Sequence, residues 1–231
     1  MRFTIFTLAF LMAATQVSFA ADNAVQPAAA APAATAAPSA APVSAPTPAA
    51  QQQAVNDVQE YLNGITTLRA RFVQTDNDGK QENGTFYLNR PGKMRIEYDP
   101  PNKDFIVADS VLIYYYDGKM KQQSSAPIGR SLADFFLRKN LTLSGDISVS
   151  DVKRENNTLQ MSLIQTRNPL AGSLTLLLNE KPLQLMAWRI VDQQGLVTEV
   201  RLTGSEVGLP LDSNLFHYYD PARRAPLNNT R

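Results

Sequence analysis

The sequence predicts a mainly β protein with a few short helices, built on one large antiparallel sheet. Short segments in which apolar and polar residues alternate recur along the chain, as in strands that bury one face. Gly, Pro, Asn and Asp residues separate them at hairpin spacing. One helical pattern precedes the series of strands and a second interrupts it. About ten or eleven strands are expected, and a sheet of that size tends to curl. Its apolar face would then line a concavity, with the helices as a lid.

The first helix is expected over about 52–63. Val55, Val58 and Leu62 recur at three- and four-residue steps, which places them on one helical face. Gly64 follows where such a helix often ends. The sequence therefore predicts an amphipathic helix that precedes the first strand.

A hairpin is predicted over 68–89, because apolar residues alternate on both sides of the turn-forming segment 76–79. The next turn is at 90–92, where Pro fixes φ and Gly accepts a positive φ. After it, apolar and charged residues alternate over 93–98, which indicates a strand with one buried and one wet face.

The remaining strands are expected on both sides of a second short amphipathic helix over 128–139. In this helix, Leu132, Phe135 and Phe136 lie three and four residues apart. A turn or short helix is also expected near 212–216. The other predicted strands lie near 105–107, 111–116, 147–149, 159–163, 174–178, 186–190 and 200–202, with a last one through Tyr218.

Both ends of the chain differ from this pattern. Residues 1–20 have the form of an export signal, with Arg2, an apolar stretch and small residues before a cut after Ala20. Residues 21–50 include 15 Ala and six Pro, which predicts an extended, disordered linker. The folded domain is expected over 51–222, followed by a flexible tail over 223–231.

Composition argues against several classes of function. Lys and Arg number 22 and Asp and Glu 21, whereas proteins that bind nucleic acid normally have a basic excess. The absence of Cys excludes disulfides and thiolate metal sites. The single histidine, His217, lies between two aromatic residues, and no catalytic motif is recognisable. We therefore expect neither enzyme activity nor a metal or cofactor.

The alternating apolar residues are candidates for a hydrophobic cavity. An ordinary protein core requires the same pattern, so these residues leave open whether protein or lipid fills the space. The candidate cavity residues are Phe72, Phe86, Leu88, Met94, Ile96, Tyr98, Phe135, Phe136 and Trp188.

The segment Leu88–Pro101, LNRPGKMRIEYDPP, resembles the central signature of the LolA family. Residues 68–74 are similar to the opening of that family, 192–198 to its Asp-x-x-Gly-x-Thr hairpin, and 215–221 to its ending. The resemblance extends over roughly 55–221, which is essentially the whole predicted domain.

This resemblance implies an open, incomplete antiparallel β-barrel with a helical lid around an apolar cavity. It also implies a monomeric periplasmic carrier of acylated lipoproteins. It would receive them from an inner-membrane ABC transporter of the LolCDE type and deliver them to an outer-membrane receptor of the LolB type. By the family's motif, Arg90 would bond to the lid helices and link their opening to cargo release. Two alternatives remain: a carrier for another lipid or a pigment precursor, and a lipid-sensing regulatory module of the RseB type with the same fold.

Overall fold

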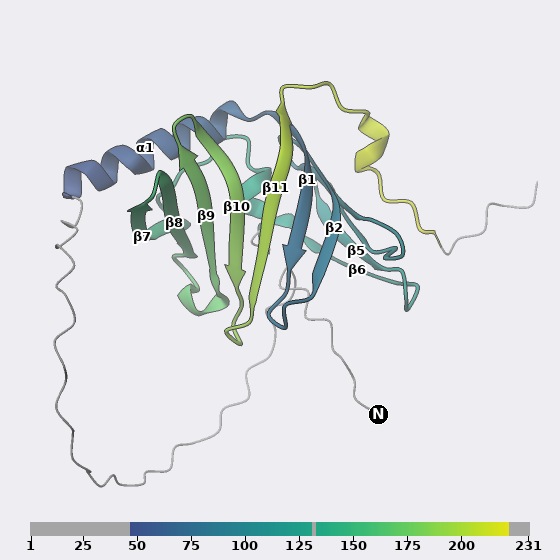
Figure 1. Ribbon diagram of the computed structural model, residues 1–231. Helices are drawn as coiled ribbons and strands as arrows, with labels where there is room; N and C mark the ends of the chain where they lie inside the picture. Colours follow the sequence, from purple (N-terminus) through teal and green to yellow (C-terminus); the bar gives the residue numbers. More distant parts are fainter. Residues whose placement is uncertain (1–46, 131–132, 222–231) are drawn as a thin grey trace, which may run out of the picture.

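The computed structural model describes residues 47–130 and 133–221, which form one antiparallel sheet of eleven strands (Figure 1). The mainly β class predicted from the sequence is therefore confirmed. The strands are β1 Thr67–Thr75, β2 Gln81–Asn89, β3 Lys93–Tyr98, β4 Phe105–Asp109, β5 Leu112–Asp117, β6 Gln122–Pro127, β7 Ile147–Glu155, β8 Thr158–Gln165, β9 Ser173–Glu180, β10 Leu183–Val191 and β11 Val197–Val207.

The sheet consists of two meanders joined side by side. Strands β1 to β6 follow one another from the centre to one edge, β7 to β11 run from the other edge back to the centre, and β1 pairs with β11. The two edge strands, β6 and β7, are not paired with each other, so the barrel stays open. They are nevertheless consecutive in sequence. The chain between Pro127 and Ile147 must therefore run from one edge of the sheet to the other.

The sheet is strongly curved, which brings distant strands together on its inner face. Trp188 on β10 and Phe86 on β2 are separated by β11 and β1, or about 14 Å across a flat sheet. Their ring centroids are nevertheless only 5.4 Å apart. The inner face is consequently a concave, apolar interior, as the alternation in the sequence predicted.

Among the described residues, two α-helices accompany the sheet: α1, Pro48–Gly64, and α2, Asp134–Leu137. The buried residues Ala54, Val58 and Leu62 face the interior, and α1 packs against β7 and β10 (Figure 1). The helix begins four residues before the predicted 52. Its first turn is formed by Pro48 at a position where a missing N–H costs nothing, after Thr47, whose hydroxyl accepts from the Ala50 amide (3.4 Å).

Three local predictions need correction. Strand β6 was not predicted, because its polar sequence QQSSAP belongs to an exposed edge strand with no apolar alternation. The predicted last strand through Tyr218 is absent: a 3₁₀ helix, Ser213–Phe216, leads into irregular chain. The predicted helix over 128–139 is divided into a 3₁₀ turn, Ile128–Arg130, and the short α2.

The predicted signal peptide 1–20, most of the predicted linker 21–50, Leu132 and the tail 223–231 lie outside the described residues. Within the part of the chain that the structure describes, no helix is both long enough and apolar enough to cross a membrane.

Candidate functional site

The interior contains an aromatic cluster of four residues, Phe86, Phe135, Phe136 and Trp188. The Phe136 ring lies 5.0 Å from the Trp188 ring and 6.4 Å from that of Phe86, and Phe135 meets Phe136 edge to face at 5.1 Å. Tilted and edge-to-face contacts of this kind are the favoured geometry for aromatic pairs. Because Phe135 and Phe136 belong to α2 and the other two to the sheet, the cluster joins the crossing segment to the inner face.

The nine residues predicted to line a cavity all lie in one contiguous core. Each is less than a tenth exposed, and the strand residues among them point to the inner face. Phe72 and Tyr98 also meet edge to face, at 5.4 Å. In this conformation their own side chains occupy the concave face. A bound lipid would therefore have to displace α2 or rearrange this core.

Arg90 joins both helices to the turn between β2 and β3. Its Nε donates to the Phe136 carbonyl oxygen of α2 (2.6 Å), and its Nη1 donates to the carbonyl oxygens of Leu62 and Ile65 at the end of α1. Its backbone amide donates to the Thr66 carbonyl oxygen (2.8 Å), which fixes the turn to the start of β1. One side chain thus connects three elements that are remote in sequence. The lid and cargo-release role that the resemblance implied for Arg90 stays a prediction.

The charge of Arg90 is partly buried and has no acidic partner among the described residues. Burial lowers the pKa of Arg90 to about 10, so the guanidinium remains charged at neutral pH. Backbone carbonyls are neutral acceptors, and hydrogen bonds from a charged donor contribute about 1.5–3 kcal/mol each. The connection between the helices is therefore substantial but can be broken.

Gly92 brings the same turn close to α2. Its amide donates to the Leu137 carbonyl oxygen (2.8 Å), and its φ of 78° lies in the left-handed region that favours glycine. A Cβ at this position would lie 2.8 Å from the Ser110 Cα. The Arg-Pro-Gly signature therefore serves two purposes, because its Arg bonds both helices and its Gly permits the close approach of the turn to Ser110.

A second set of contacts, which the sequence did not predict, ties α1 to the chain after α2. Asn63 Nδ2 donates to the Leu141 carbonyl oxygen (3.0 Å), and the Leu141 amide donates back to Asn63 Oδ1 (2.8 Å). The Leu143 amide donates to Gln59 Oε1 (2.9 Å). We use the term lid for α1 together with residues 133–146, because these contacts join the two parts. No local pattern marks them, since partners about 80 residues apart carry no periodic signal.

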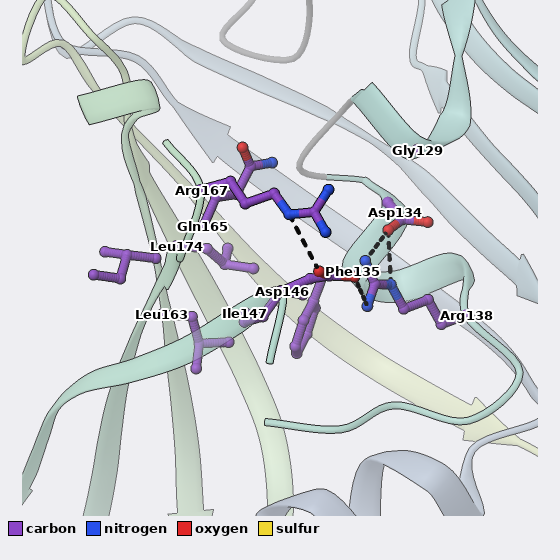
Figure 2. A pocket seen from close by; sticks show the side chains of 11 residues that line it. Gly129, Asp134, Phe135, Arg138, Asp146, Ile147, Leu163, Gln165, Arg167 and Leu174 are labelled. Carbon is purple, nitrogen blue, oxygen red and sulfur yellow. Dashed lines mark hydrogen bonds and ion pairs between the residues drawn. The ribbon is translucent and has the colours of Figure 1, made fainter. Parts of the chain in front are cut away.

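A cleft of about 190 Å³ lies beside α2 at the β7 edge of the sheet (Figure 2). Its apolar lining includes Phe135 from α2 together with Ile147, Leu163 and Leu174 from the sheet. Of the nine predicted cavity residues, Phe135 is the one that lines this cleft.

Charged side chains form the rim of this cleft. Arg138 pairs with Asp134 at 2.5 Å and with Asp146 at 3.9 Å, while Arg167 reaches Asp146 at 4.0 Å (Figure 2). Because two cations and two carboxylates balance, the rim carries no net charge. An apolar lining beneath a neutral polar rim suits an amphiphilic molecule.

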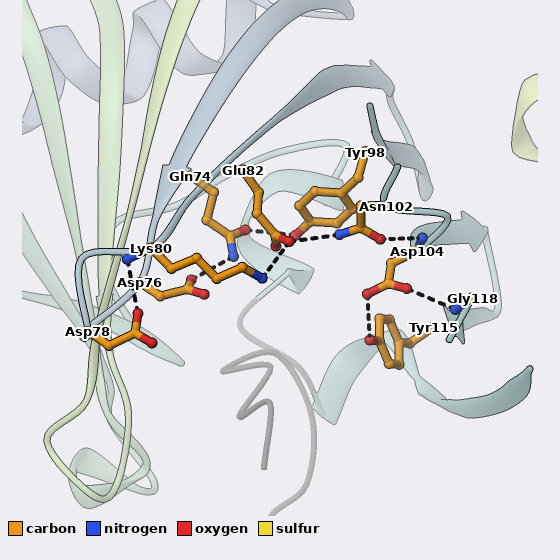
Figure 3. Close-up of polar contacts among 10 residues, drawn as sticks. All are labelled: Gln74, Asp76, Asp78, Lys80, Glu82, Tyr98, Asn102, Asp104, Tyr115 and Gly118. Carbon is orange, nitrogen blue, oxygen red and sulfur yellow. Dashed lines mark hydrogen bonds and ion pairs between the residues drawn. The ribbon is translucent and has the colours of Figure 1, made fainter. Parts of the chain in front are cut away.

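The turn end of β1 and β2, far from α1, contains a polar network (Figure 3). The Tyr98 hydroxyl donates to Gln74 Oε1 (2.7 Å), and Gln74 donates to Asp76 (2.8 Å). Asn102 and Lys80 both donate to Glu82, at 3.0 and 2.7 Å. Burial, with the nearby carboxylates of Glu82 and Asp76, raises the pKa of Tyr98 well above its usual range. These side chains close this end of the interior.

The sequence matches a known protein family. The model described as "Outer membrane lipoprotein carrier protein LolA" matches residues 63–219. An outer-membrane lipoprotein carrier protein from Methylococcus capsulatus is 25% identical over 173 residues, which cover 71% of this chain and 83% of that protein. One from Legionella pneumophila (strain Paris) is 25% identical over 178 residues, covering 74% and 87%.

Solved structures of other proteins also overlay on most of this chain. An uncharacterized conserved protein from Thermus thermophilus overlays with a TM-score of 0.46 at 15% identity, covering 75% of this chain and 97% of that one. A LolA superfamily protein from Nitrosomonas europaea gives a TM-score of 0.42 at 8% identity, with coverages of 71% and 97%.

Proposed function

The chain belongs to the LolA family, and from this premise we propose that it carries acylated lipoproteins through the periplasm to the outer membrane. An ABC transporter of the LolCDE type would load it at the inner membrane, and a receptor of the LolB type would accept the cargo. An export signal over residues 1–20, cut after Ala20, would bring the chain to this compartment. Its role would be that of a carrier and not of an enzyme.

The observation that carries this proposal is the position of Arg90 between the lid and the apolar interior. Its guanidinium bonds the Phe136 carbonyl of α2 and the end of α1. The Phe136 ring in turn lies against Trp188 at the inner face. When the Arg90 hydrogen bonds break, α2 and its aromatic side chains are free to leave the interior, which would open an apolar surface to acyl chains.

The need for such a surface follows from the chemistry of the cargo. Each methylene exposed to water costs about 0.8 kcal/mol, so a chain of roughly a dozen methylenes costs about 10 kcal/mol. A lipoprotein with several such chains would not leave one membrane for the other unshielded. The inner face offers Leu, Ile, Met and aromatic side chains for this purpose, and the carrier itself remains in water.

Delivery requires that the closed, empty form of the carrier be stable enough for the cargo to dissociate at the receptor. A ligand shifts an equilibrium between open and closed forms only through its different affinity for the two. Every hydrogen bond that stabilises the closed, empty form therefore lowers the apparent affinity of the carrier for cargo, because a smaller fraction of the protein is open. In this scheme the Arg90 bonds set the affinity of the carrier between those of donor and acceptor.

Native mass spectrometry of the full chain, purified gently from the periplasm, tests this proposal. We expect a fraction of the protein to carry the added mass of an acylated lipoprotein. Protein that stays free of ligand, even after incubation with lipoprotein and a LolCDE-type transporter, would contradict the carrier role. A bound pigment precursor or another lipid would instead show that the protein is a carrier for that compound.

A further inference from the structure

Trp188 carries a buried hydrogen-bond donor that nothing in the described structure satisfies. The side chain is 2% exposed, and no acceptor within residues 47–130 and 133–221 pairs with its indole Nε1. A buried polar group without a partner costs about 1–3 kcal/mol, and most such groups in proteins are paired. An apolar interior that needed only bulk at this position could have used Phe, so the unpaired N–H requires an explanation.

The position of Trp188 connects it to the cleft beside α2. On the inner face, Trp188 pairs across the strands with Leu176, and the neighbouring Leu174 pairs with Ile190. Leu174 and Leu176 are two residues apart on β9, or about 7 Å. Leu174 lines the cleft, so the pair of Trp188 and Leu176 is the next cross-strand pair along β9 and β10 on the same face.

The lid covers Trp188 on the other side. The Phe136 ring lies 5.0 Å from the indole, and the Phe136 backbone carbonyl is the acceptor for Arg90 Nε. Movement of α2 would therefore uncover the indole, and would connect it to the cleft that Phe135 lines. The donor is hidden in the closed form and becomes accessible in the form that takes up cargo.

The surroundings of this donor restrict the ligand that could satisfy it. A hydrocarbon chain alone would leave the N–H unpaired, and a free carboxylate would bring a charge into an apolar interior at high cost. A neutral carbonyl oxygen at the head of an acyl chain meets both conditions. Resting on the carrier function proposed above, we propose that Trp188 Nε1 donates to the ester carbonyl of an acylglycerol group, so that the site selects acyl esters over plain alkyl chains.

The test compares two lipids and two proteins. The probes are 1,2-dioctanoylglycerol and its diether analogue 1,2-dioctylglycerol, each used below the concentration at which it aggregates, with affinities measured by isothermal titration calorimetry. Wild-type full chain should bind the diester about five- to tenfold more tightly than the diether, which is the contribution of one buried hydrogen bond. In Trp188→Phe this preference should disappear, so that the diester loses more affinity than the diether.

A matched variant and a spectroscopic measurement separate hydrogen bonding from packing. Phe86→Leu removes aromatic volume from the same cluster and should weaken both lipids equally. The infrared carbonyl band of a ¹³C-labelled diester should shift to lower frequency on binding to the wild type and to Phe86→Leu, but not to Trp188→Phe.

The outcomes distinguish this inference from the carrier proposal. Equal binding of diester and diether by the wild type, or an equal loss of both in Trp188→Phe, would overturn the role of Trp188 and leave the carrier function standing. Failure of the wild type to bind either lipid, under conditions in which it also takes up no lipoprotein, would overturn both.

Discussion

The two ends of the barrel interior are covered in different ways. At the lid end, Arg90 donates to backbone carbonyls of two helices, and one of these, α2, has only four residues. At the other end, Gln74, Glu82 and Tyr98 belong to neighbouring strands, because β1 pairs with β2 and β2 pairs with β3. The hydrogen bonds there join side chains to side chains. Closure of the lid end therefore depends on a few long-range hydrogen bonds. The polar end is held by residues of strands that are themselves paired in the sheet.

This difference indicates which end can open. A four-residue helix is too short to be stable by itself, so α2 depends on its contacts with the turn and with the aromatic cluster. The polar network cannot move without separating strands, which would break the backbone hydrogen bonds of the hairpins. Opening of the lid breaks side-chain contacts and a few long-range hydrogen bonds but no strand pairing, so the lid is the end that can open.

The largest effect is expected for Arg90→Leu. Losing the two hydrogen bonds from a charged donor to the Phe136 and Leu62 carbonyls weakens closure of the lid by about 3–6 kcal/mol, so the loaded open form is favoured. Cargo uptake should persist, while transfer to the receptor in a reconstituted assay slows at least about tenfold. The control is Arg71→Leu, which removes an exposed arginine paired with Asp99 and should transfer normally. Normal transfer by Arg90→Leu would show that the lid bonds do not govern release.

A smaller effect at the same end is expected for Asn63→Ala. The change removes both hydrogen bonds between α1 and Leu141, and should lower the free energy of unfolding in urea by about 1–2 kcal/mol. Asn56→Ala on the same helix is the matched control, because Asn56 bonds only to Gln52 on the exposed side. If the two variants were equally stable, the second set of lid contacts would have no energetic importance.

The smallest effect is expected at the polar end, for Tyr98→Phe. Loss of the hydrogen bond to Gln74 should cost about 1 kcal/mol of stability at neutral pH and leave lipoprotein transfer unchanged. A pH dependence should also change. Because the pKa of Tyr98 is raised on folding, the unfolded chain loses its phenolic proton first, so stability falls as pH rises above about 10.

This alkaline decline should be shallower in Tyr98→Phe, measured as urea unfolding between neutral and alkaline pH. Tyr115, whose pKa burial also raises, should account for part of the decline that remains. Tyr87→Phe serves as the control, since Tyr87 lies on the outer face of β2. A defect in transfer by Tyr98→Phe would contradict the view that this end only closes the barrel.

Features with a local cause could be predicted from the sequence. Met94, Ile96 and Tyr98 alternate with charged residues, and all three are buried on the inner face. The turn at 90–92 was predictable because Pro and Gly fix its backbone. These patterns give the sheet, the curl and the apolar interior, since each depends on residues that are neighbours in the chain.

Features that depend on distant partners could not be predicted in the same way. Strand β6 is polar throughout and is recognisable only by its pairing with β5. His217 and Tyr218 were expected in a strand, but Tyr218 stacks on Tyr114 outside the sheet, at 4.7 Å. The bonds of Asn63 to Leu141 likewise have no sequence signal. The Pro48 start of α1 did have one, a Thr-Pro cap, which the Ala- and Pro-rich composition of 21–50 concealed.

Hydrogen exchange of the full chain, followed by mass spectrometry in the wild type and in Arg90→Leu, tests most directly whether one end opens and the other does not. The account predicts that amides of residues 133–146 exchange at least about tenfold faster in the variant, because α2 loses its principal connection to the turn. Amides at the turn between β1 and β2 should be unchanged. Faster exchange at both ends alike, or unaltered exchange in the lid, would contradict it.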